Sequence, residues 1–160
     1  MSDLLTQLNG GSVPTLDILF LLTFAALLPS IVVMMTSFTR TIIILSFTRN
    51  AVGVQQAPPN MVLVGIAMFL TLYIMSPVIS RINEEAYEPY IREEISQEEA
   101  VERMIEPLKE FMVRNTYKST LDNFVRMSNT TIEEEAIDYP LTVLVPSFMT
   151  SELKRGFVAG

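Results

Sequence analysis

Carboxylates are the side chains in this sequence with the greatest capacity for chemistry. Adjacent glutamates occur at 84–85, 93–94 and 98–99, and three occur in a row at 133–135. Paired carboxylates can act as general acid and base, or as oxygen ligands of a divalent metal ion. The chain has no cysteine and no histidine. Their absence excludes disulfides, Cys/His zinc sites and catalysis by a cysteine or histidine.

The pattern around these glutamates favours a solvated surface over a site. They lie among apolar residues that recur at helical spacing, which is typical of the water-facing side of an amphipathic helix. The run at 133–135 lacks the alternating ligand positions and the glycine of a calcium loop. The sequence also contains no glycine-rich phosphate loop and no nucleophile motif. We therefore predict no catalytic, cofactor-binding or metal-binding residue, and no enzymatic activity.

Two arginines, Arg40 and Arg49, stand out because they lie beside long apolar runs. A charge near membrane depth is costly, so it usually faces a bundle interior or reaches the interface. One interpretation is that each arginine anchors the end of a helix. The other is that it lines an aqueous path or pairs with a partner subunit. The sequence favours the anchor for either residue taken alone, and leaves the second interpretation open.

Two uncharged stretches dominate the N-terminal half of the chain. There are 22 residues without charge between Asp17 and Arg40, and 31 between Arg49 and Arg81. A helix needs about 20 predominantly apolar residues to cross the hydrocarbon core of a bilayer. Both stretches are long enough, so we predict an all-α integral membrane protein.

The polar and helix-breaking residues around these stretches predict a helical hairpin in the membrane. A polar lead over 1–17 precedes the hairpin at 18–81, whose two arms are separated by a break at 50–60. Pro29 should kink the first arm or split it into two half-helices, because proline removes a backbone donor. The apolar residues 41–48 are too few to span alone. They should continue the first helix or run along its neighbours.

The acidic residues are concentrated in one region. Residues 82–138 hold 15 of the 18 acidic side chains and 6 of the 11 basic ones. Such a balance argues against nucleic acid as a partner. The connector between the two spans carries arginine and no acid, so the positive-inside rule places it in the cytoplasm. We therefore predict an acidic, helical extracytoplasmic domain over 82–140, and the start of a further, truncated membrane segment over 141–160.

A capping box predicts where a helix begins in the acidic domain. Ser96 can accept a hydrogen bond from the Glu99 amide, while the Glu99 side chain reaches back to Ser96. The helix should cover 97–115, with Pro107 bending or restarting it. Its apolar stripe consists of Val101, Met104, Ile105, Leu108, Phe111 and Met112, and a second short stripe consists of Leu121, Phe124 and Val125.

Several strings of residues resemble the FliP family of flagellar export-gate proteins and its type III secretion homologues. They occur in the family's order from about residue 18 to the end of the chain. The strings are Leu28-Pro29-Ser30, TSFTR at 36–40, SFTRN at 46–50, QQAPPN at 55–60 with the apolar run that follows, EPLKEFM at 106–112 and SELKRGF at 151–157.

The resemblance implies a structural subunit without a cofactor. Several copies, together with two other small membrane proteins of the export apparatus, form a ring-like gate through which unfolded flagellar proteins pass. The expected location is the bacterial cytoplasmic membrane at the flagellar basal body, in contact with membrane lipid. The residues that carry the family signature, and that should act in assembly rather than in a reaction, are Pro29, Thr36, Phe38, Arg40, Arg49, Gln56, Pro58, Pro59, Asn60, Pro77, Pro107, Ser151, Glu152 and Lys154.

Two features depart from the family pattern. Many members begin with a cleavable signal peptide, whereas no lysine or arginine precedes the first apolar run here, so we predict an uncleaved first span. The family also continues beyond the position of Gly160 into a second apolar hairpin with a methionine-rich gasket. No gasket residue can be assigned, and we predict that the sequence is a fragment or a truncated product.

Other classes of function remain as alternatives. A membrane receptor or sensor with an acidic extracytoplasmic domain would need a cytoplasmic output, and the connector offers only about a dozen residues for one. The equivalent subunit of a virulence type III secretion system would share the same strings. A membrane-bound hydrolase lacks the residues described above. The match along the whole chain favours the flagellar export gate.

Overall fold

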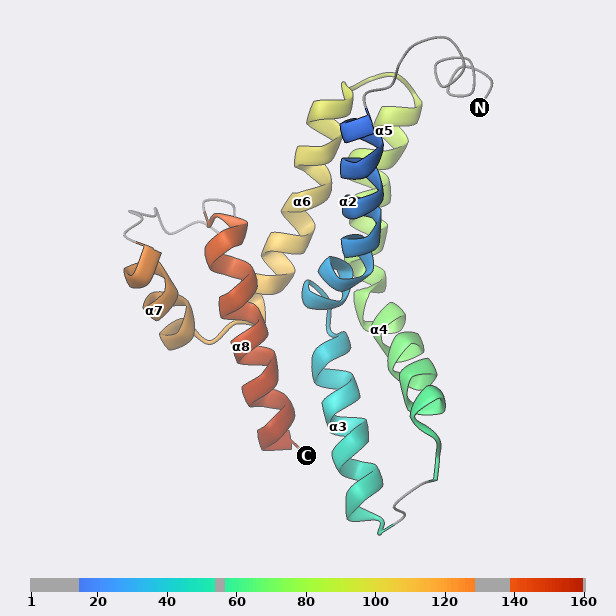
Figure 1. Ribbon diagram of the computed structural model, residues 1–160. Helices are drawn as coiled ribbons and strands as arrows, with labels where there is room; N and C mark the ends of the chain where they lie inside the picture. The colour runs from blue at the N-terminus through green and yellow to red at the C-terminus, as the bar shows by residue number, and fades with distance from the viewer. Residues whose placement is uncertain (1–14, 54–56, 129–138, 160) are drawn as a thin grey trace. The chain divides into compact units, whose positions relative to one another are not determined.

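The computed structural model describes residues 15–53, 57–128 and 139–159, and every element in these ranges is helical (Figure 1). The prediction of an all-α chain is confirmed. The chain divides into two compact units, one up to Val32 and one from Val33 onward. The elements are α2 (Thr15–Met34), α3 (Phe38–Ala51), α4 (Asn60–Ile82), the π-helical turn η1 (Asn83–Tyr87), α5 (Glu88–Ile91), α6 (Gln97–Arg114), α7 (Lys118–Ser128) and α8 (Leu141–Ala159).

The first helix, α2, runs from Thr15 to Met34 and contains Pro29 without interruption. Of the two outcomes predicted for Pro29, the split into half-helices is therefore wrong. Within α2, the Thr23 hydroxyl donates to the Leu19 carbonyl at 2.8 Å, a bond that leaves the helix intact.

The chain leaves helical structure between α2 and α3, so residues 41–48 do not continue the first helix as one prediction had it. They form the body of α3, which begins at Phe38. The Thr36 hydroxyl donates to the Val33 carbonyl, and the Phe38 amide donates to the Thr36 hydroxyl. Side chains that bond to nearby backbone in this way offer the chain an alternative to helical bonding. The Thr36 hydroxyl therefore supplies a break that proline does not.

Helices α3 and α4 lie side by side as a hairpin (Figure 1). After Ala51 the chain turns at Gly53, whose φ of +78° lies in the left-handed region that glycine adopts at little cost. The Gly53 amide donates to the Asn50 carbonyl at 3.1 Å and closes the end of α3. The hairpin partner of α4 within this unit is thus the short helix α3.

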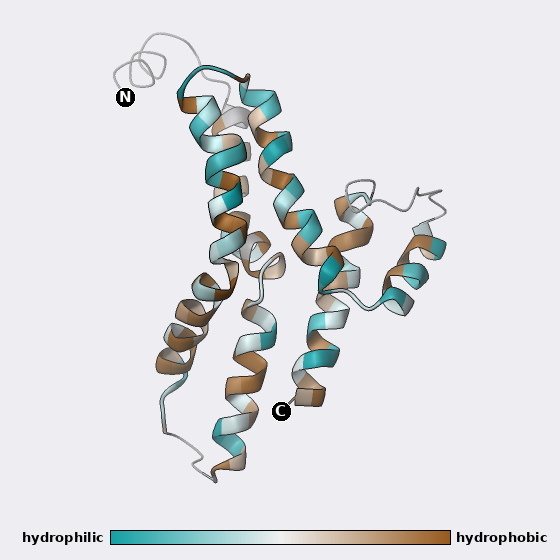
Figure 2. Cartoon of the chain, turned by 180° about the vertical axis from the view of Figure 1, so that it is seen from behind, coloured by the Kyte–Doolittle hydropathy of each residue, from teal (hydrophilic) through white to brown (hydrophobic). Residues whose placement is uncertain are grey.

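Helix α4 continues through η1 into α5, so the chain is helical without a break from Asn60 to Ile91. Within the part of the chain that the structure describes, this is the one helix long and apolar enough to cross a membrane, while Ile18–Ile31 is a shorter apolar helix. Figure 2 shows that hydrophobic residues concentrate along α4, whereas α5 and α6 carry both hydrophobic and hydrophilic residues. One face of α4 is buried at three- and four-residue steps, by Leu63, Ala67, Thr71, Met75 and Val78.

The turn from α5 into α6 is built from two local capping motifs. The Glu94 amide donates to the Pro89 carbonyl and the Glu93 amide donates to the Tyr90 carbonyl, which closes the end of α5. Glu93 holds a φ of 59°, which glycine would adopt with less strain. Ser96 then caps α6 by accepting from the Glu99 amide at 3.2 Å, as predicted. The Glu99 carboxylate instead accepts from Arg103 at 2.6 Å.

Replacing Ser96 with alanine should lower the free energy of unfolding by about 1 kcal/mol, because the Glu99 amide loses its acceptor. Thermal unfolding of the purified full chain in detergent, followed by circular dichroism, measures this loss. Ser119→Ala, at an exposed position in α7, is the matched control and should leave the unfolding temperature almost unchanged. Equal shifts in both variants would show that the cap does not stabilise α6.

The core of the second unit lies between α6, α7 and α8. Its buried side chains are Met112, Leu121, Val143, Leu144 and Phe148, with Phe111, Phe124 and Val125 packed against them. The C-terminal half of the predicted stripe on α6 is therefore a core face, whereas Val101 is 48% exposed. Helix α6 passes through the buried Pro107 without restarting.

An ionic contact joins the end of α4 to α6. Arg81 donates to Glu110 at 2.7 and 3.3 Å and to Glu85 at 2.9 and 3.3 Å. The hydrogen bonds from Arg81 hold the pKa of Glu110 below its usual range. Their stabilising effect is present at neutral pH and is lost as the pH falls through that lowered pKa. It is small, because both side chains are more than a third exposed.

Candidate functional site

The predicted signature residues fall on several elements of the structure. Gln56 lies outside the described residues. Pro29 lies in α2 and Thr36 in the turn that follows it; Phe38, Arg40 and Arg49 lie in α3; Pro58 and Pro59 lie in the connector; Asn60 and Pro77 lie in α4, Pro107 in α6, and Ser151, Glu152 and Lys154 in α8. Two sets of these residues come together, one at each end of α3.

The first set centres on an ion pair between α3 and α8. Arg40 donates to the carboxylate of Glu152, which lies 112 positions away in the chain. The Glu152 side chain is completely buried and that of Arg40 is 28% exposed. The pair therefore joins two of the strings that carry the family resemblance, TSFTR and SELKRGF, in one contact. A buried carboxylate without such a partner would be strongly destabilising.

Helix α6 completes this contact through its last turn. The Asn115 side-chain oxygen, at the end of α6, accepts from Arg40 at 3.1 Å and from Arg155 at 3.2 Å. The Tyr117 amide donates to the Ser151 hydroxyl at 3.1 Å. We call this set, Arg40, Asn115, Tyr117, Ser151, Glu152 and Arg155, the polar joint. It ties α3, the α6–α7 corner and α8 together.

Two cations of α8 flank the ring of Tyr117. The Lys154 ammonium lies 5.1 Å from the ring centroid and the Arg155 guanidinium 4.8 Å. Both distances are within the range of a cation–π interaction. Lys154, a predicted signature residue, thus contacts the polar joint through this ring. The arrangement fixes the rotation of α8 against the corner that follows α6.

The polar joint is built to hold helices in place. Arg40 and Glu152 pair with each other, and Arg155 donates to Asn115. The Ser151 hydroxyl donates to the Ser147 carbonyl and accepts from the Tyr117 amide. Arg40 Nε and Glu152 Oε2 are buried without a partner among the described residues. The described part of the chain also places no group of three or more acidic side chains where a metal ion could be held. The geometry supports structural positioning.

Helices α3 and α8 approach closely just beyond the polar joint. A Cβ atom at Gly156 would lie 2.8 Å from Ile43 Cγ2, a distance that real Cβ atoms do not tolerate. Next to this crossing, the rings of Phe47 and Phe157 meet edge to face, with centroids 5.5 Å apart. Glycine at 156 is therefore needed for the spacing that lets Arg40 reach Glu152.

Gly156→Ala should destabilise the second unit by about 1–3 kcal/mol, because the added methyl group pushes α8 away from Ile43. Gly65→Ala is the matched control: a Cβ there meets nothing within 4 Å. It should stabilise α4 by about 0.5–1 kcal/mol. Thermal unfolding of both variants separates the two effects. Ile43→Ala should cost less in the Gly156→Ala background than in the original chain, and equal costs would contradict a clash.

The second set of signature residues closes the other end of the α3–α4 hairpin. Arg49 donates to the Asn60 side chain at 2.6 Å, and its other contact, with the Pro58 carbonyl, is 3.5 Å long. Arg49 lies in the last turn of α3 and Asn60 is the first residue of α4. The arginine therefore bonds within its own chain and joins the end of α3 to the start of α4.

Asn115, Tyr117, Arg155 and Gly156 belong to this arrangement but were not predicted as site residues. Arg155 and Gly156 lie inside the SELKRGF string, which offered a signal. Asn115 and Tyr117 follow a helix that the sequence already predicted to end near 115. The available signal was a polar residue, Asn115, at the predicted end of that helix, followed two positions later by an aromatic one, Tyr117. Their partners lie 34 to 75 positions away, beyond the reach of local patterns.

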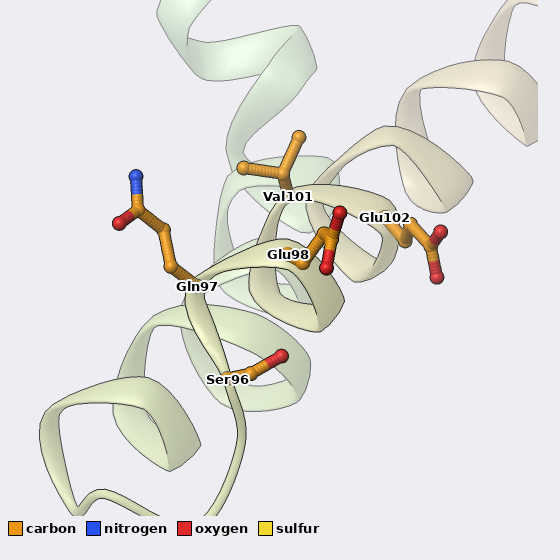
Figure 3. A pocket seen from close by; sticks show the side chains of 5 residues that line it. All are labelled: Ser96, Gln97, Glu98, Val101 and Glu102. Carbon is orange, nitrogen blue, oxygen red and sulfur yellow. The ribbon is translucent and has the colours of Figure 1, made fainter.

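The paired glutamates of α6 lie apart from both sets. Figure 3 shows Glu98 and Glu102 side by side near Ser96 and Val101, on a shallow open surface. Glu99 pairs with Arg103 on the same helix at 2.6 Å. Glu98 and Glu102 remain a solvated face in our interpretation.

Comparison with known proteins agrees with the order of strings in the sequence. The model of the FliP family matches residues 21–160. A flagellar biosynthetic protein FliP of Pectobacterium carotovorum subsp. carotovorum is 47% identical over 154 residues, 95% of this chain. Those of Aquifex aeolicus and Bacillus subtilis are 45% and 44% identical over 93% and 91% of it.

The chain spans less than two thirds of the length of these relatives: 60% of the Pectobacterium protein, 63% of the Aquifex protein and 66% of the Bacillus protein. The family assignment rests on the matched residues, which include both ends of α3, all of α4 and the SELKRGF segment of α8. The predicted resemblance is confirmed. The chain belongs to the FliP family.

Proposed function

We propose that this chain is a structural subunit of the flagellar type III protein export gate, in the bacterial cytoplasmic membrane at the flagellar basal body. The observation that carries the proposal is the apolar helix Asn60–Ile91 in a chain of the FliP family. The relatives are flagellar biosynthetic proteins, which favours the flagellum over a virulence system. The role is to form a path for unfolded flagellar proteins.

The proposed topology is a membrane helical hairpin with an extracytoplasmic helical domain. Helix α4 spans the membrane, the α3–α4 turn faces the cytoplasm, and η1 to α7 lie outside. The domain plan stays as proposed from the sequence: a lead over 1–17, the hairpin at 18–81, the acidic domain at 82–140 and a further membrane segment from 141. The chain passes from α4 into the acidic domain through η1 without a break in helical structure.

The ion pair of the polar joint suits this placement. Arg40 lies nine positions before Arg49 in α3, or about 13 Å along the helix axis. With the α3–α4 turn at the cytoplasmic boundary, Arg40 and Glu152 lie at membrane depth. Charged residues at that depth usually face a bundle interior and pair with each other. The contact between Arg40 and Glu152 satisfies both conditions.

The proposed partners are further copies of this chain, the other two small membrane subunits of the export gate, and membrane lipid, with flagellar substrates passing through. The apolar side chains of α4 that face away from its buried residues supply the contact surface. They include Met61, Phe69, Leu72 and Tyr73, each more than half exposed. Apolar surface of that extent in one helix indicates a lipid or protein partner.

Assembly tests the proposal. The chain is co-expressed with the other two export-gate subunits of one flagellated bacterium, extracted in mild detergent and purified through a tag on this chain. The proposal predicts one complex with a fixed ratio of the three proteins. An unrelated two-span membrane protein with the same tag is the control. Recovery of this chain alone, in the membrane but without either partner, would overturn the proposal.

Orientation is tested with single cysteines, because the chain has none of its own. Glu94→Cys lies in the turn between α5 and α6, and Ala51→Cys lies at the end of α3. Both positions are exposed. An impermeant maleimide added outside intact cells should modify Glu94→Cys and leave Ala51→Cys unmodified until the cells are opened. The reverse pattern would show that the acidic domain faces the cytoplasm.

A further inference from the structure

Three buried polar atoms near the start of α3 have no hydrogen-bond partner among the residues that the structure describes. They are Ser37 Oγ, Arg40 Nε and Glu152 Oε2. Ser37 is 2% exposed, and the Glu152 side chain is completely buried. Buried polar groups of folded proteins nearly always have a partner, either in the protein or in an ordered water. These three atoms therefore point to a ligand.

The side chains that carry these atoms share one contact between α3 and α8. Arg40 donates to Glu152 through Nη2. Arg40 Nε and Glu152 Oε2 therefore lie on the same two planar groups as the atoms that already touch. Ser37 precedes Arg40 by three positions, which places both residues on one face of α3.

The direction of the two helices brings Ser37 closer to the ion pair. Thr39 donates to Met149 at 3.9 Å, and four positions later along α3, Ile43 lies against Gly156, so α3 and α8 run in the same direction. Long side chains on a helix lean towards its N-terminus. Both side chains of the ion pair therefore lean towards the turn that carries Ser37.

The chemistry of the three atoms defines the ligand. Arg40 Nε only donates a hydrogen bond, the Glu152 carboxylate only accepts, and the Ser37 hydroxyl does either. A metal cation would be repelled by the guanidinium, and an anion by the carboxylate. Because all three atoms are buried, they offer no surface to a partner subunit or a lipid headgroup. A water molecule meets these conditions, and buried waters make about three hydrogen bonds to such groups.

We propose that one ordered water is bound between Ser37, Arg40 and Glu152. It accepts from Arg40 Nε, donates to Glu152 Oε2 and forms its third hydrogen bond with the Ser37 hydroxyl. The water extends the polar joint by one turn, to the residue that precedes α3. It supplies hydrogen bonds that a buried ion pair needs in addition to its own contact. The water belongs to the fold of the chain, so its presence does not depend on the proposed function.

Replacing Ser37 with alanine tests the proposal through the sign of its effect. A buried hydroxyl without any partner costs stability, so its removal would leave the unfolding temperature unchanged or raise it. Removing a hydroxyl that holds the water should instead lower the unfolding temperature of the full chain in detergent by about 2–4 °C. Ser37 makes no side-chain capping bond to α3, so a lost cap does not contribute. An unchanged or raised temperature would overturn the proposal.

Ser46→Ala is the matched control, because the Ser46 hydroxyl donates to the Ile42 carbonyl within α3 and needs no water. It should not lower the unfolding temperature. The Ser37 replacement is then repeated in a chain that carries both Arg40→Met and Glu152→Met, which removes the other two partners of the water. There it should lose most of its effect. An equal fall in both backgrounds would overturn the proposal, because Ser37 would then stabilise the chain without the water.

A density map of the purified full chain, at a resolution that shows ordered water, is the direct measurement. Crystallography or electron microscopy should show a peak within about 2.7–3.2 Å of both Arg40 Nε and Glu152 Oε2, next to the Ser37 hydroxyl. A direct hydrogen bond between Arg40 Nε and Glu152 Oε2, without a peak beside them, would overturn the proposal.

Discussion

Replacing Glu152 with alanine should lower the free energy of unfolding by about 3 kcal/mol or more. The change removes the carboxylate that faces Arg40 and leaves a largely buried guanidinium with Asn115 as its remaining partner. It also opens a cavity in a helix face that is fully buried. The loss is measured by thermal unfolding of the full chain in detergent, with the helical signal as the reporter.

Glu99→Ala provides the comparison for Glu152→Ala. Glu99 also pairs with an arginine, Arg103, at 2.6 Å, but both side chains are more than 40% exposed. Surface pairs of this kind contribute less than about 1 kcal/mol. The loss of stability in Glu152→Ala should therefore be much larger than the loss in Glu99→Ala. Similar losses would mean that the Arg40–Glu152 pair is as weak as a solvated one.

Replacing Phe148 with alanine should cost about 3–5 kcal/mol, because its ring is completely buried in the core between α6, α7 and α8. It also loses the edge-to-face contact with Phe111, whose ring centroid is 5.8 Å away. Thermal or denaturant unfolding of the full chain measures the loss. The variant should keep its helical content at low temperature while melting earlier.

Phe157→Ala tests whether the core position, rather than the loss of any phenyl ring, explains the effect. Phe157 lies in the same helix, α8, and also pairs with an aromatic ring, but it is 64% exposed. Its replacement should cost about 0.5–1.5 kcal/mol. Phe111→Ala should fall between the two, since that ring is half-buried. A larger loss of unfolding free energy for Phe157→Ala than for Phe148→Ala would show that the core does not lie between α6, α7 and α8.

Periodicity and capping predicted the helices of the acidic domain because those signals are local. Ser96 marked the start of α6, and the apolar residues of α6 and α7 marked the faces that meet in the core. Each of these inferences needed residues only three or four positions apart. The FliP family was also recognised from the sequence, because the strings of residues that resemble the family occur in the same order and a sequence match needs no structure.

The break after α2 was misplaced because proline was given more weight than hydroxyl side chains. Pro29 lies within α2, where the bond it cannot donate is one among many. Thr36 ends the helical path instead, because its hydroxyl donates to the Val33 carbonyl and accepts from the Phe38 amide. Length and hydropathy also favoured a long first arm, although α3 forms the hairpin with α4.

The polar joint could not be assembled from sequence because its members are far apart along the chain. Arg40 and Glu152 were both singled out, but as separate signature residues, and nothing local indicated that they meet. Asn115 and Tyr117 were missed for the same reason. The close approach at Gly156 depends on the side chain of Ile43 in another helix. Such contacts follow from tertiary packing, which a local pattern does not encode.

The central claim is that Arg40 and Glu152 hold helices together for assembly. The most direct test compares Arg40→Met, Glu152→Met and the double variant for unfolding and for complex formation with the other two export-gate subunits. Each single variant should lose stability and assembly, because it leaves one buried charge unpaired. The double variant should recover most of both, because a well-packed apolar pair can replace a buried ion pair. A double variant that is as unstable as the two single losses added together, or one that folds but does not assemble, would contradict the claim.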